Sequence, residues 1–172
     1  KRSKPEVVYM LAAFAHEGLS QFCPNLIVDN NFNIAMNILV SSIRHNVKRF
    51  VFTSSMSIYG NQDAPFMELM SKKPVDIYGV TKAAFEDSLQ IMSKVHGIEY
   101  AIIRPHNVIG IRQALHDPYR NVVGIFMNRL LADKPFYIYG DGEQRRAFSF
   151  VNDFTPCLAE CGFSPKTNRE IF

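Results

Sequence analysis

The sequence lacks the features that define several large classes of protein. Its three cysteines, Cys23, Cys157 and Cys161, are an odd number without C-x-x-C spacing, so neither a disulfide framework nor a zinc site is indicated and we expect no metal. No apolar run approaches the ~18 residues that a membrane span requires. We therefore expect no membrane segment, reduced thiols and a soluble protein of the cytoplasm.

Strong charge of one sign is also missing. The formal net charge is +3 and 20% of the residues are charged, which suits an anionic small molecule but not the concentrated basic face of a nucleic-acid-binding protein. We therefore expect no nucleic-acid partner. With 172 residues, 47% of them hydrophobic, the chain is long enough to bury a sizeable core.

Short continuous apolar runs alternate with longer stretches of helical periodicity. This alternation is typical of parallel strands that are covered on both faces by crossover helices. It predicts an α/β fold with a partial Rossmann-like parallel sheet in the order strand, helix, strand, helix, strand. The expected elements are strands at 7–13, 49–55 and 100–104, and helices at 28–45 and 78–96.

Beyond Gly110 the pattern changes. A loop rich in Asp, Arg and Pro precedes a helix expected at 122–131, short strands at 136–139 and 148–151, and a closing helix. We interpret residues 1–110 as part of a dinucleotide-binding domain and residues 111–172 as an incomplete substrate-binding portion.

Tyr78 and Lys82 are the strongest chemical signal. Residues four apart share one face of a helix, so the Lys82 ammonium can approach the Tyr78 phenol and favour its ionised form. A phenolate is a competent general base for a hydroxyl group. Ser55 ends the preceding apolar run, and its hydroxyl could complete a proton relay. The pattern indicates proton-coupled hydride chemistry at an alcohol carbon.

Ligands of open parallel sheets bind beyond the carboxyl ends of the strands. The residues expected at these ends are small or polar, and each also has an ordinary structural interpretation: tight packing for Ala12 and Ala13, strand-end or helix caps for Ser54 and Ser55, and a turn for Asn107. Their convergence on one edge of one sheet favours a binding site.

The chain resembles the extended short-chain dehydrogenase/reductase superfamily, in particular nucleotide-sugar epimerases of the UDP-glucose 4-epimerase type. The resemblance runs through nearly the whole chain. It rests on the segments Val8 to Ala13, Asp29 to Asn31, Phe52 to Gly60, Tyr78 to Lys82, Arg104 to Gly110 and Gly140 to Arg146.

The resemblance implies a role for each matching residue. Ser55, Tyr78 and Lys82 are the implied catalytic triad, which oxidises the sugar transiently at C4 with NAD as the cofactor. The substrate implied by the resemblance is a nucleotide-diphosphate sugar, with UDP as the nucleotide. The implied NAD contacts are Leu11, Ala12, Ala13, Asn30, Ser54, Tyr78, Lys82 and Pro105, and the implied substrate contacts are Asn107, Asn121, Tyr139 and Arg146.

Two of those substrate roles compete with simpler ones. The Arg146 guanidinium offers a planar fork for pyrophosphate oxygens, or it is a solvated charge beside Arg145. The Tyr139 ring could stack on uracil, or it is an amphipathic strand residue. Relatives that act as dehydratases or decarboxylases carry acidic residues just after the catalytic hydroxyl; here those positions are Met56 and Ser57, which favours an epimerase.

The chain also departs from the family pattern. Met10, Ile109 and Ala147 stand where many members have His, Tyr and Asp. A dinucleotide-binding fold needs a glycine-rich turn after its first strand, and Gly140-Asp141-Gly142 comes too late and lacks a third glycine. We expect that roughly two βαβ units, on the order of 60 residues, are missing from the start.

Two hypotheses follow from that departure. The chain is a segment of a nucleotide-sugar epimerase with little activity or NAD binding of its own, or it is a truncated, non-catalytic product that acts as an assembly or binding module. The 7–13 strand would have an unpaired edge, and such edges recruit other chains. The helices at 28–45 and 78–96 also resemble those of the family's two-fold dimer, so we expect a homodimer or a larger homo-oligomer.

Overall fold

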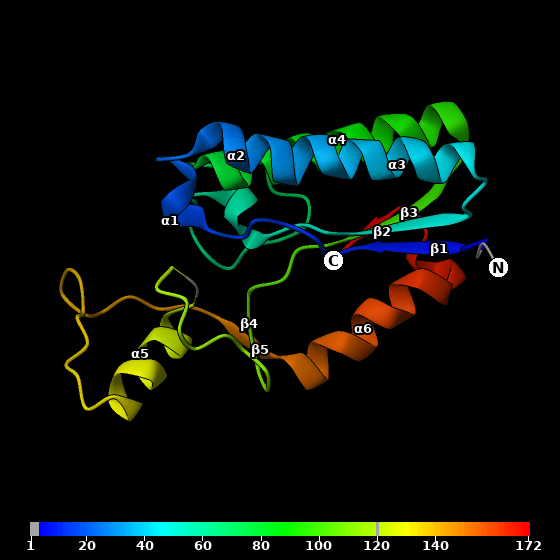
Figure 1. The fold of residues 1–172 in the computed structure, drawn as a ribbon. Coiled ribbons are helices and arrows are strands. Elements are labelled where there is room, and N and C mark those ends of the chain that lie inside the picture. Colours follow the sequence, from blue (N-terminus) through cyan, green and yellow to red (C-terminus); the bar gives the residue numbers. More distant parts are fainter. Residues whose placement is uncertain (1–3, 120) are drawn as a thin grey trace.

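The computed structural model describes residues 4–119 and 121–172. Its helices and strands follow the α/β order expected from the sequence (Figure 1). The strands are β1 (Val7–Met10), β2 (Arg49–Thr53), β3 (Glu99–Ile103), β4 (Asn107–Ile109), β5 (Phe148–Phe150) and β6 (Glu170–Ile171). The α-helices are α1 (Glu17–Ser20), α2 (Pro24–Val28), α3 (Ile34–Arg44), α4 (Ile77–His96), α5 (Val122–Leu131) and α6 (Val151–Phe163).

Four parallel strands form the main sheet in the order β1-β2-β3-β6. Val7 pairs with Arg49, Arg49 with Glu99, and Ala101 with Glu170. The parallel sheet confirms the predicted fold class. Within the part of the chain that the structure describes, β1 is one edge of this sheet. A second, two-stranded parallel sheet pairs β4 with β5.

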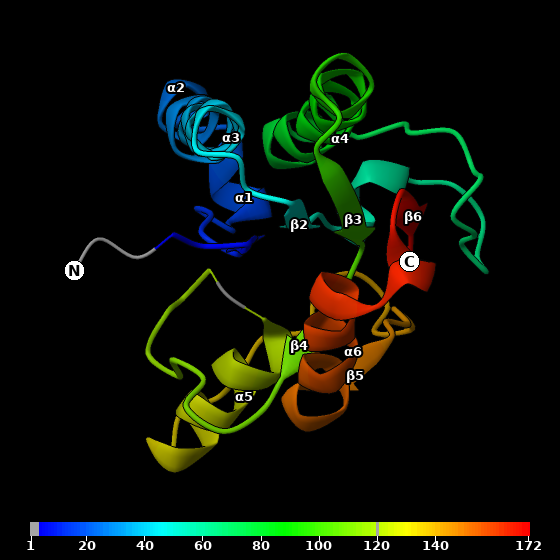
Figure 2. The ribbon, with the colours of Figure 1, turned by 90° about the vertical axis from the view of Figure 1, so that its right-hand side faces the viewer.

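Helices cover both faces of the main sheet, with α3 and α4 on one side and α6 on the other (Figure 2). Successive side chains of a strand point to opposite faces. Phe50 and Phe52 therefore pack with Phe85 under α3 and α4, whereas Val51 packs with Leu158 of α6. Burial on both sides explains why these strands read as continuous apolar runs.

The boundaries of the first two expected strands and of the first expected helix need correction. β1 ends at Met10 instead of residue 13, because the chain then turns and the Phe14 backbone pairs with the buried Asn31 side chain: its N–H donates to Oδ1 (2.6 Å) and its carbonyl accepts from Nδ2 (3.2 Å). β2 ends at Thr53 instead of residue 55. Helical backbone begins at Pro24, four residues before the expected start, since proline is well suited to the first helical position.

The expected strand over residues 100–104 lies one residue earlier, and the expected strand over 136–139 is wrong. Residues 132–147 form neither helix nor strand. The Phe136 ring stacks on Phe126 of α5 at 4.4 Å, and Arg129 lies over the Tyr137 ring. The apolar side chains of this segment therefore pack against a helix and form no strand pairing.

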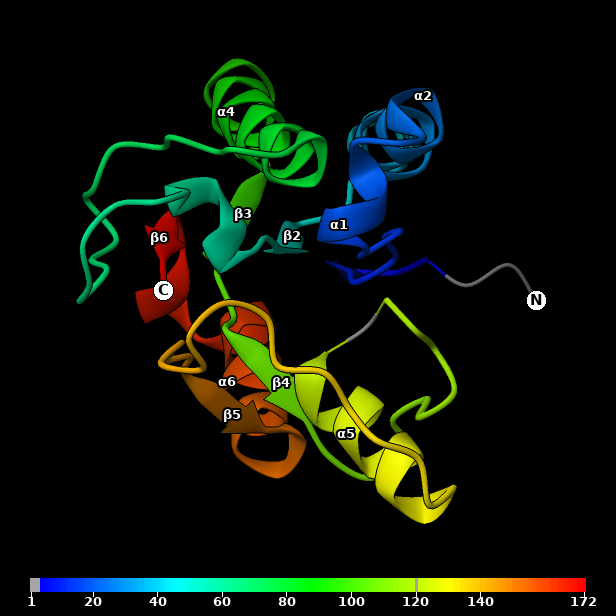
Figure 3. The ribbon, with the colours of Figure 1, turned by 90° about the vertical axis from the view of Figure 1, so that its left-hand side faces the viewer.

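The other expected elements of the second half are present: α5 spans 122–131, β5 lies at 148–150 and so ends one residue before the expected strand, and α6 follows it. The expected closing helix is not the last element, because β6 comes after α6. In Figure 3, α5, β4 and β5 lie on the side of the main sheet away from α3 and α4. The division of the chain into two parts at residue 110 stays a prediction. The elements α6 and β6 come after residue 110 in the sequence but belong to the layers of the main sheet. No helix among the described residues is both long and apolar enough to cross a membrane.

Candidate active site

Tyr78 and Lys82 lie one turn apart on the buried face of α4. The helix begins after Asp76, whose carboxylate accepts a hydrogen bond from the Gly79 N–H at 2.7 Å and so caps the first turn. Gly79 lets this turn approach its neighbours, because an added Cβ would lie 2.9 Å from the Ser57 carbonyl oxygen. The capped, closely packed turn holds Tyr78 against the segment that follows β2.

Lys82 is a buried cation, only 4% exposed. Its Nζ donates to the Thr53 carbonyl at 2.7 Å and lies 4.8 Å from the centre of the Phe52 ring and 5.7 Å from that of Tyr78. Burial lowers the pKa of Lys82 to about 8, against the opposing effect of the Glu86 carboxylate. The expected approach of Lys82 to the Tyr78 ring is therefore present.

Ser55 follows β2 and caps a short 3-10 helix over Met56–Tyr59. Its Oγ accepts from the Ser57 N–H at 3.1 Å and from the Ser57 hydroxyl at 3.0 Å. The cap expected as the simpler interpretation of Ser55 is thus present. The two interpretations are compatible, because Ser55 also lines the cavity that Tyr78 enters.

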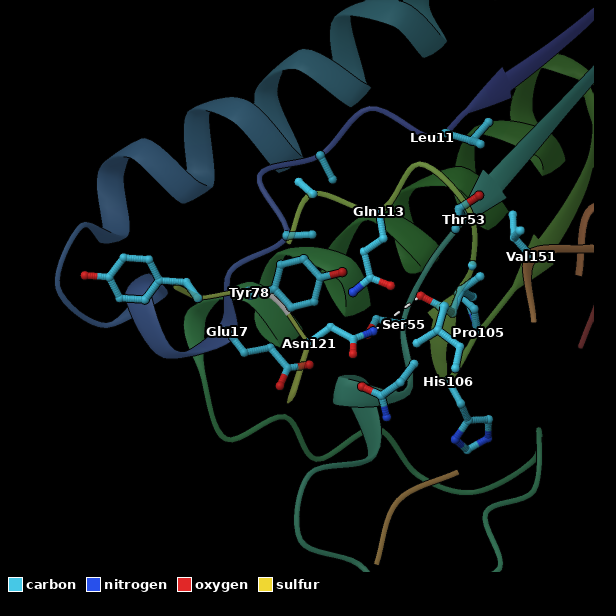
Figure 4. A pocket seen from close by; sticks show the side chains of 18 of the residues that line it. Leu11, Glu17, Thr53, Ser55, Tyr78, Pro105, His106, Gln113, Asn121 and Val151 are labelled. Atoms are coloured by element: carbon cyan, nitrogen blue, oxygen red, sulfur yellow. Dashed lines mark hydrogen bonds between the residues drawn. The ribbon is translucent and has the colours of Figure 1, made fainter. Parts of the chain in front are cut away.

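A cavity of about 680 Å³ lies beyond the carboxyl ends of β1, β2 and β3 (Figure 4). Each of the three strands contributes the residues that follow it, so the predicted convergence of strand ends is present. Nine of the sequence-predicted site residues line this cavity: Leu11, Ala13, Ser54, Ser55, Tyr78, Lys82, Pro105, Asn107 and Asn121.

Four other expected site residues do not line it. Ala12 is exposed beside the cavity wall, and Asn30 points its amide to the Leu26 carbonyl at 2.8 Å. Tyr139 is 82% exposed and borders a second, smaller hollow of about 360 Å³ beside α5. Arg146 is exposed and donates to the neighbouring Arg145 carbonyl. Their proposed ligand contacts remain predictions.

Asn107 and Asn121, the two asparagines predicted to contact the substrate, brace the walls of the cavity. The Asn107 amide donates to the Ala147 carbonyl at 3.1 Å and so ties the segment after β3 to the segment before β5. Asn121 has φ = 56° and caps α5 by accepting from the Val123 N–H at 3.1 Å. Its amide also reaches the Val108 carbonyl at 3.4 Å.

Sequence reasoning missed several residues of this region, and three of them have a clear place in it. Glu17 and Gln113 line the cavity, and Asn31 holds the backbone after β1. Asn31 is buried and its neighbour Asn30 is not. Which of the two side chains is buried depends on which face of the helical segment turns toward the sheet. Glu17 gave no signal, because it lies in a short loop helix outside every motif that we recognised.

Two hydroxyl groups make the cavity suited to a polar ligand. Thr53 Oγ1 and Ser54 Oγ are buried at the end of β2 and have no hydrogen-bond partner within residues 4–119 and 121–172. Buried polar groups are normally paired, so these two unpaired hydroxyl groups, although shielded from solvent, mark the end of β2 as a candidate position for a bound polar molecule. Ala13 lines the same cavity with a small side chain, and this polar, uncrowded lining suits the nicotinamide side of NAD, the cofactor that the sequence resemblance implies.

Comparison with known proteins places this geometry in a family. Residues 1–159 match the model of the NAD dependent epimerase/dehydratase family. The chain therefore belongs to that family.

Three relatives illustrate the match. The chain is 34% identical over 135 residues to a putative UDP-glucose 4-epimerase of Methanocaldococcus jannaschii, covering 75% of this chain and 43% of the relative. The Thermotoga maritima UDP-glucose 4-epimerase with UDP-glucose has a TM-score of 0.91 at 30% identity, over 98% of this chain and 55% of that one. The UDP-glucuronic acid 4-epimerase of Bacillus cereus, in complex with UDP-glucuronic acid and NAD, has a TM-score of 0.84 at 28% identity, over 97% and 52%. The chain thus spans about half the length of these relatives.

Proposed function

We propose that this chain carries the catalytic residues of an NAD-dependent nucleotide-sugar 4-epimerase that acts on a UDP-linked sugar. The observation that carries the proposal is the meeting of Ser55, Tyr78 and Lys82 in one cavity at the carboxyl ends of three parallel strands. Membership of the family and the likeness to UDP-sugar epimerases support it.

Tyr78 is the proposed general base, which takes the proton of the sugar 4-hydroxyl and later returns it. The Lys82 ammonium lies 5.7 Å from the centre of the Tyr78 ring and favours the phenolate by its charge. Ser55 is proposed to hydrogen-bond the same sugar oxygen. The hydrogen bond from Lys82 to the Thr53 carbonyl favours the position in which the ammonium lies beside the ring.

Bound NAD would supply a reversible acceptor for the hydride of C4. The residues proposed to hold its nicotinamide side are Leu11, Ala13, Ser54 and Pro105, which line the cavity. Ala12 and Asn30 are proposed contacts that would need the ligand to extend beyond the cavity.

The nucleotide end of the substrate is assigned to the second half of the chain. Asn107 and Asn121 line the cavity, and each side-chain NH2 has a second N–H besides the one that donates to a backbone carbonyl; Arg146 and Tyr139 lie outside the cavity. The charge of Arg146 acts on Glu17 of the cavity wall, which supports a place for Arg146 near the rim. There its guanidinium is proposed to pair with pyrophosphate oxygens.

An epimerase is favoured over a dehydratase or a decarboxylase because Met56 and Ser57 follow Ser55. Neither side chain is an acid at neutral pH, and the Ser57 hydroxyl is hydrogen-bonded to Ser55. The test is to incubate the full-length protein with NAD and UDP-glucose, UDP-N-acetylglucosamine, dTDP-glucose or UDP-glucuronate and to identify products by NMR. A 4-epimer is expected; a 4-keto-6-deoxy sugar or a pentose would overturn the assignment.

The alternative, a non-catalytic module, is not favoured by the comparisons. It predicts that substitution of Tyr78, Lys82 or Ser55 leaves the protein's behaviour unchanged, whereas the epimerase predicts loss of turnover.

A further inference from the structure

The cavity wall contains one acid. Glu17, the first residue of α1, is the sole carboxylate among the cavity-lining residues that the structure describes. Figure 4 shows its side chain directed toward the part of the cavity that Tyr78 and Asn121 line. We propose that Glu17 makes the sugar site selective for uncharged sugars and against uronic acids, an inference that rests on the proposed epimerase function.

The proposed selectivity follows from the position of Glu17 relative to the reacting carbon of the sugar. The sugar carbon that Tyr78 serves is C4, and the group that distinguishes glucose from glucuronate is attached to the adjacent C5. A uronate carboxylate therefore lies one ring carbon from the reacting centre, in the region that Glu17 and Tyr78 share. Like charges brought together with little water between them are costly. A hydroxymethyl group in that place can instead donate a hydrogen bond to Glu17.

The charges around Glu17 support this interpretation. Glu17 is open to the cavity, yet the surrounding protein removes enough water to raise its pKa; the nearby Asp76 raises this pKa further and Arg146 lowers it. Asp76 is itself committed to the Gly79 N–H. The negative charge at this end of the cavity is thus reinforced by a second carboxylate.

Three cations must be considered. Arg146 acts on Glu17 with the opposite charge, but it lies outside the cavity lining and is assigned to pyrophosphate oxygens. Lys82 is buried behind Tyr78 and donates to the Thr53 carbonyl. Arg112 lines the cavity from an exposed position with φ = 67°. If Arg112 instead paired with a uronate carboxylate, the protein would turn over uronates well, which is the opposite of the proposed selectivity.

The experiment compares UDP-glucose with UDP-glucuronate as substrates of the full-length protein at about pH 8, where a carboxyl group is ionised. We expect kcat/KM to favour UDP-glucose by roughly 100-fold, Glu17→Gln to reduce that ratio by about tenfold, and Glu17→Lys to reduce it further. Glu160→Gln removes an equal charge from the exposed face of α6 and should leave the ratio unchanged.

Each result has one meaning. Turnover of UDP-glucose with a ratio that Glu17→Gln and Glu17→Lys do not change would overturn this inference alone, as would wild-type turnover of UDP-glucuronate equal to that of UDP-glucose. A ratio that Glu160→Gln changes as much as Glu17→Gln would also overturn it, because the effect would then come from the net charge. Failure of the wild type to epimerise either sugar would overturn both the inference and the proposed function.

Discussion

Replacing Lys82 with Met should make the protein more stable at neutral pH, although it removes a proposed catalytic group. Lys82 is 4% exposed, and burial lowers its pKa from 10.5 to about 8. This displacement corresponds to about 3 kcal/mol that the folded state loses by burying the charge. Methionine has a similar length and no charge, so it removes the penalty while filling the same space.

The sign follows from the two pKa values. The folded protein binds the proton of Lys82 less tightly than the unfolded chain, so the penalty is complete below about pH 8 and disappears as the pH rises to about 10.5. The substitution also removes the hydrogen bond to the Thr53 carbonyl, worth about 1 kcal/mol. We therefore expect Lys82→Met to stabilise the fold by about 2 kcal/mol at pH 7, and the gain to vanish by about pH 10.

Urea unfolding followed by circular dichroism, repeated at several pH values between about 7 and 10, measures this difference. Lys94→Met, an exposed lysine near the end of the same helix, is the matched control and should change stability little at any pH. A Lys82→Met variant that is less stable than the wild type at pH 7, or a gain that does not depend on pH, would refute the reasoning.

Three further predictions concern catalysis, the cofactor and assembly. Tyr78→Phe in the full-length protein should lower turnover by roughly 100-fold with little change in unfolding free energy, and near-normal turnover would contradict the role given to Tyr78. The 172-residue chain expressed alone should bind NAD weakly or not at all, since its sequence holds no glycine-rich turn for the pyrophosphate; a micromolar or tighter one-to-one complex in calorimetry would count against this. The protein should be at least a dimer in light scattering across a dilution series, and Ile91→Lys, on the exposed apolar face of α4, should weaken association; a monomer at every concentration would exclude the predicted assembly.

Sequence patterns predicted best the helices and strands whose ends are marked by particular residue types. The α4 helix runs from Ile77 to His96, as the apolar stripe and Gly97 indicated, and Gly97 closes it with φ = 75°. The alternation of strands and helices predicted a parallel sheet, and a parallel sheet brings its strand ends to one edge. This rule predicted that the candidates that follow the strands lie together, and six of them line the cavity: Leu11, Ala13, Ser54, Ser55, Pro105 and Asn107. Tyr78 and Lys82 were instead predicted from their helical spacing, and Asn121 from the family resemblance.

The predictions that were wrong or missing concern features that depend on tertiary contacts. The apolar run at 136–139 has the composition of a strand, but Phe136 and Tyr137 pack on α5 instead. The early end of β1 depends on Asn31, whose side chain replaces a neighbouring strand as the partner of Phe14. Glu17 belongs to no motif, and only the path of the chain after β1 brings it to the cavity.

Incubation of UDP-glucose with the full-length protein and NAD in D2O tests hydride transfer at C4 most directly. In the proposed mechanism the C4 hydrogen leaves and returns as a hydride, and Tyr78 transfers only the hydroxyl proton. Proton NMR should therefore show the 4-epimer with ordinary hydrogen retained at C4. Deuterium at C4 of the product would show that the carbon had exchanged a proton with solvent, and would contradict the proposed roles of Tyr78 and NAD.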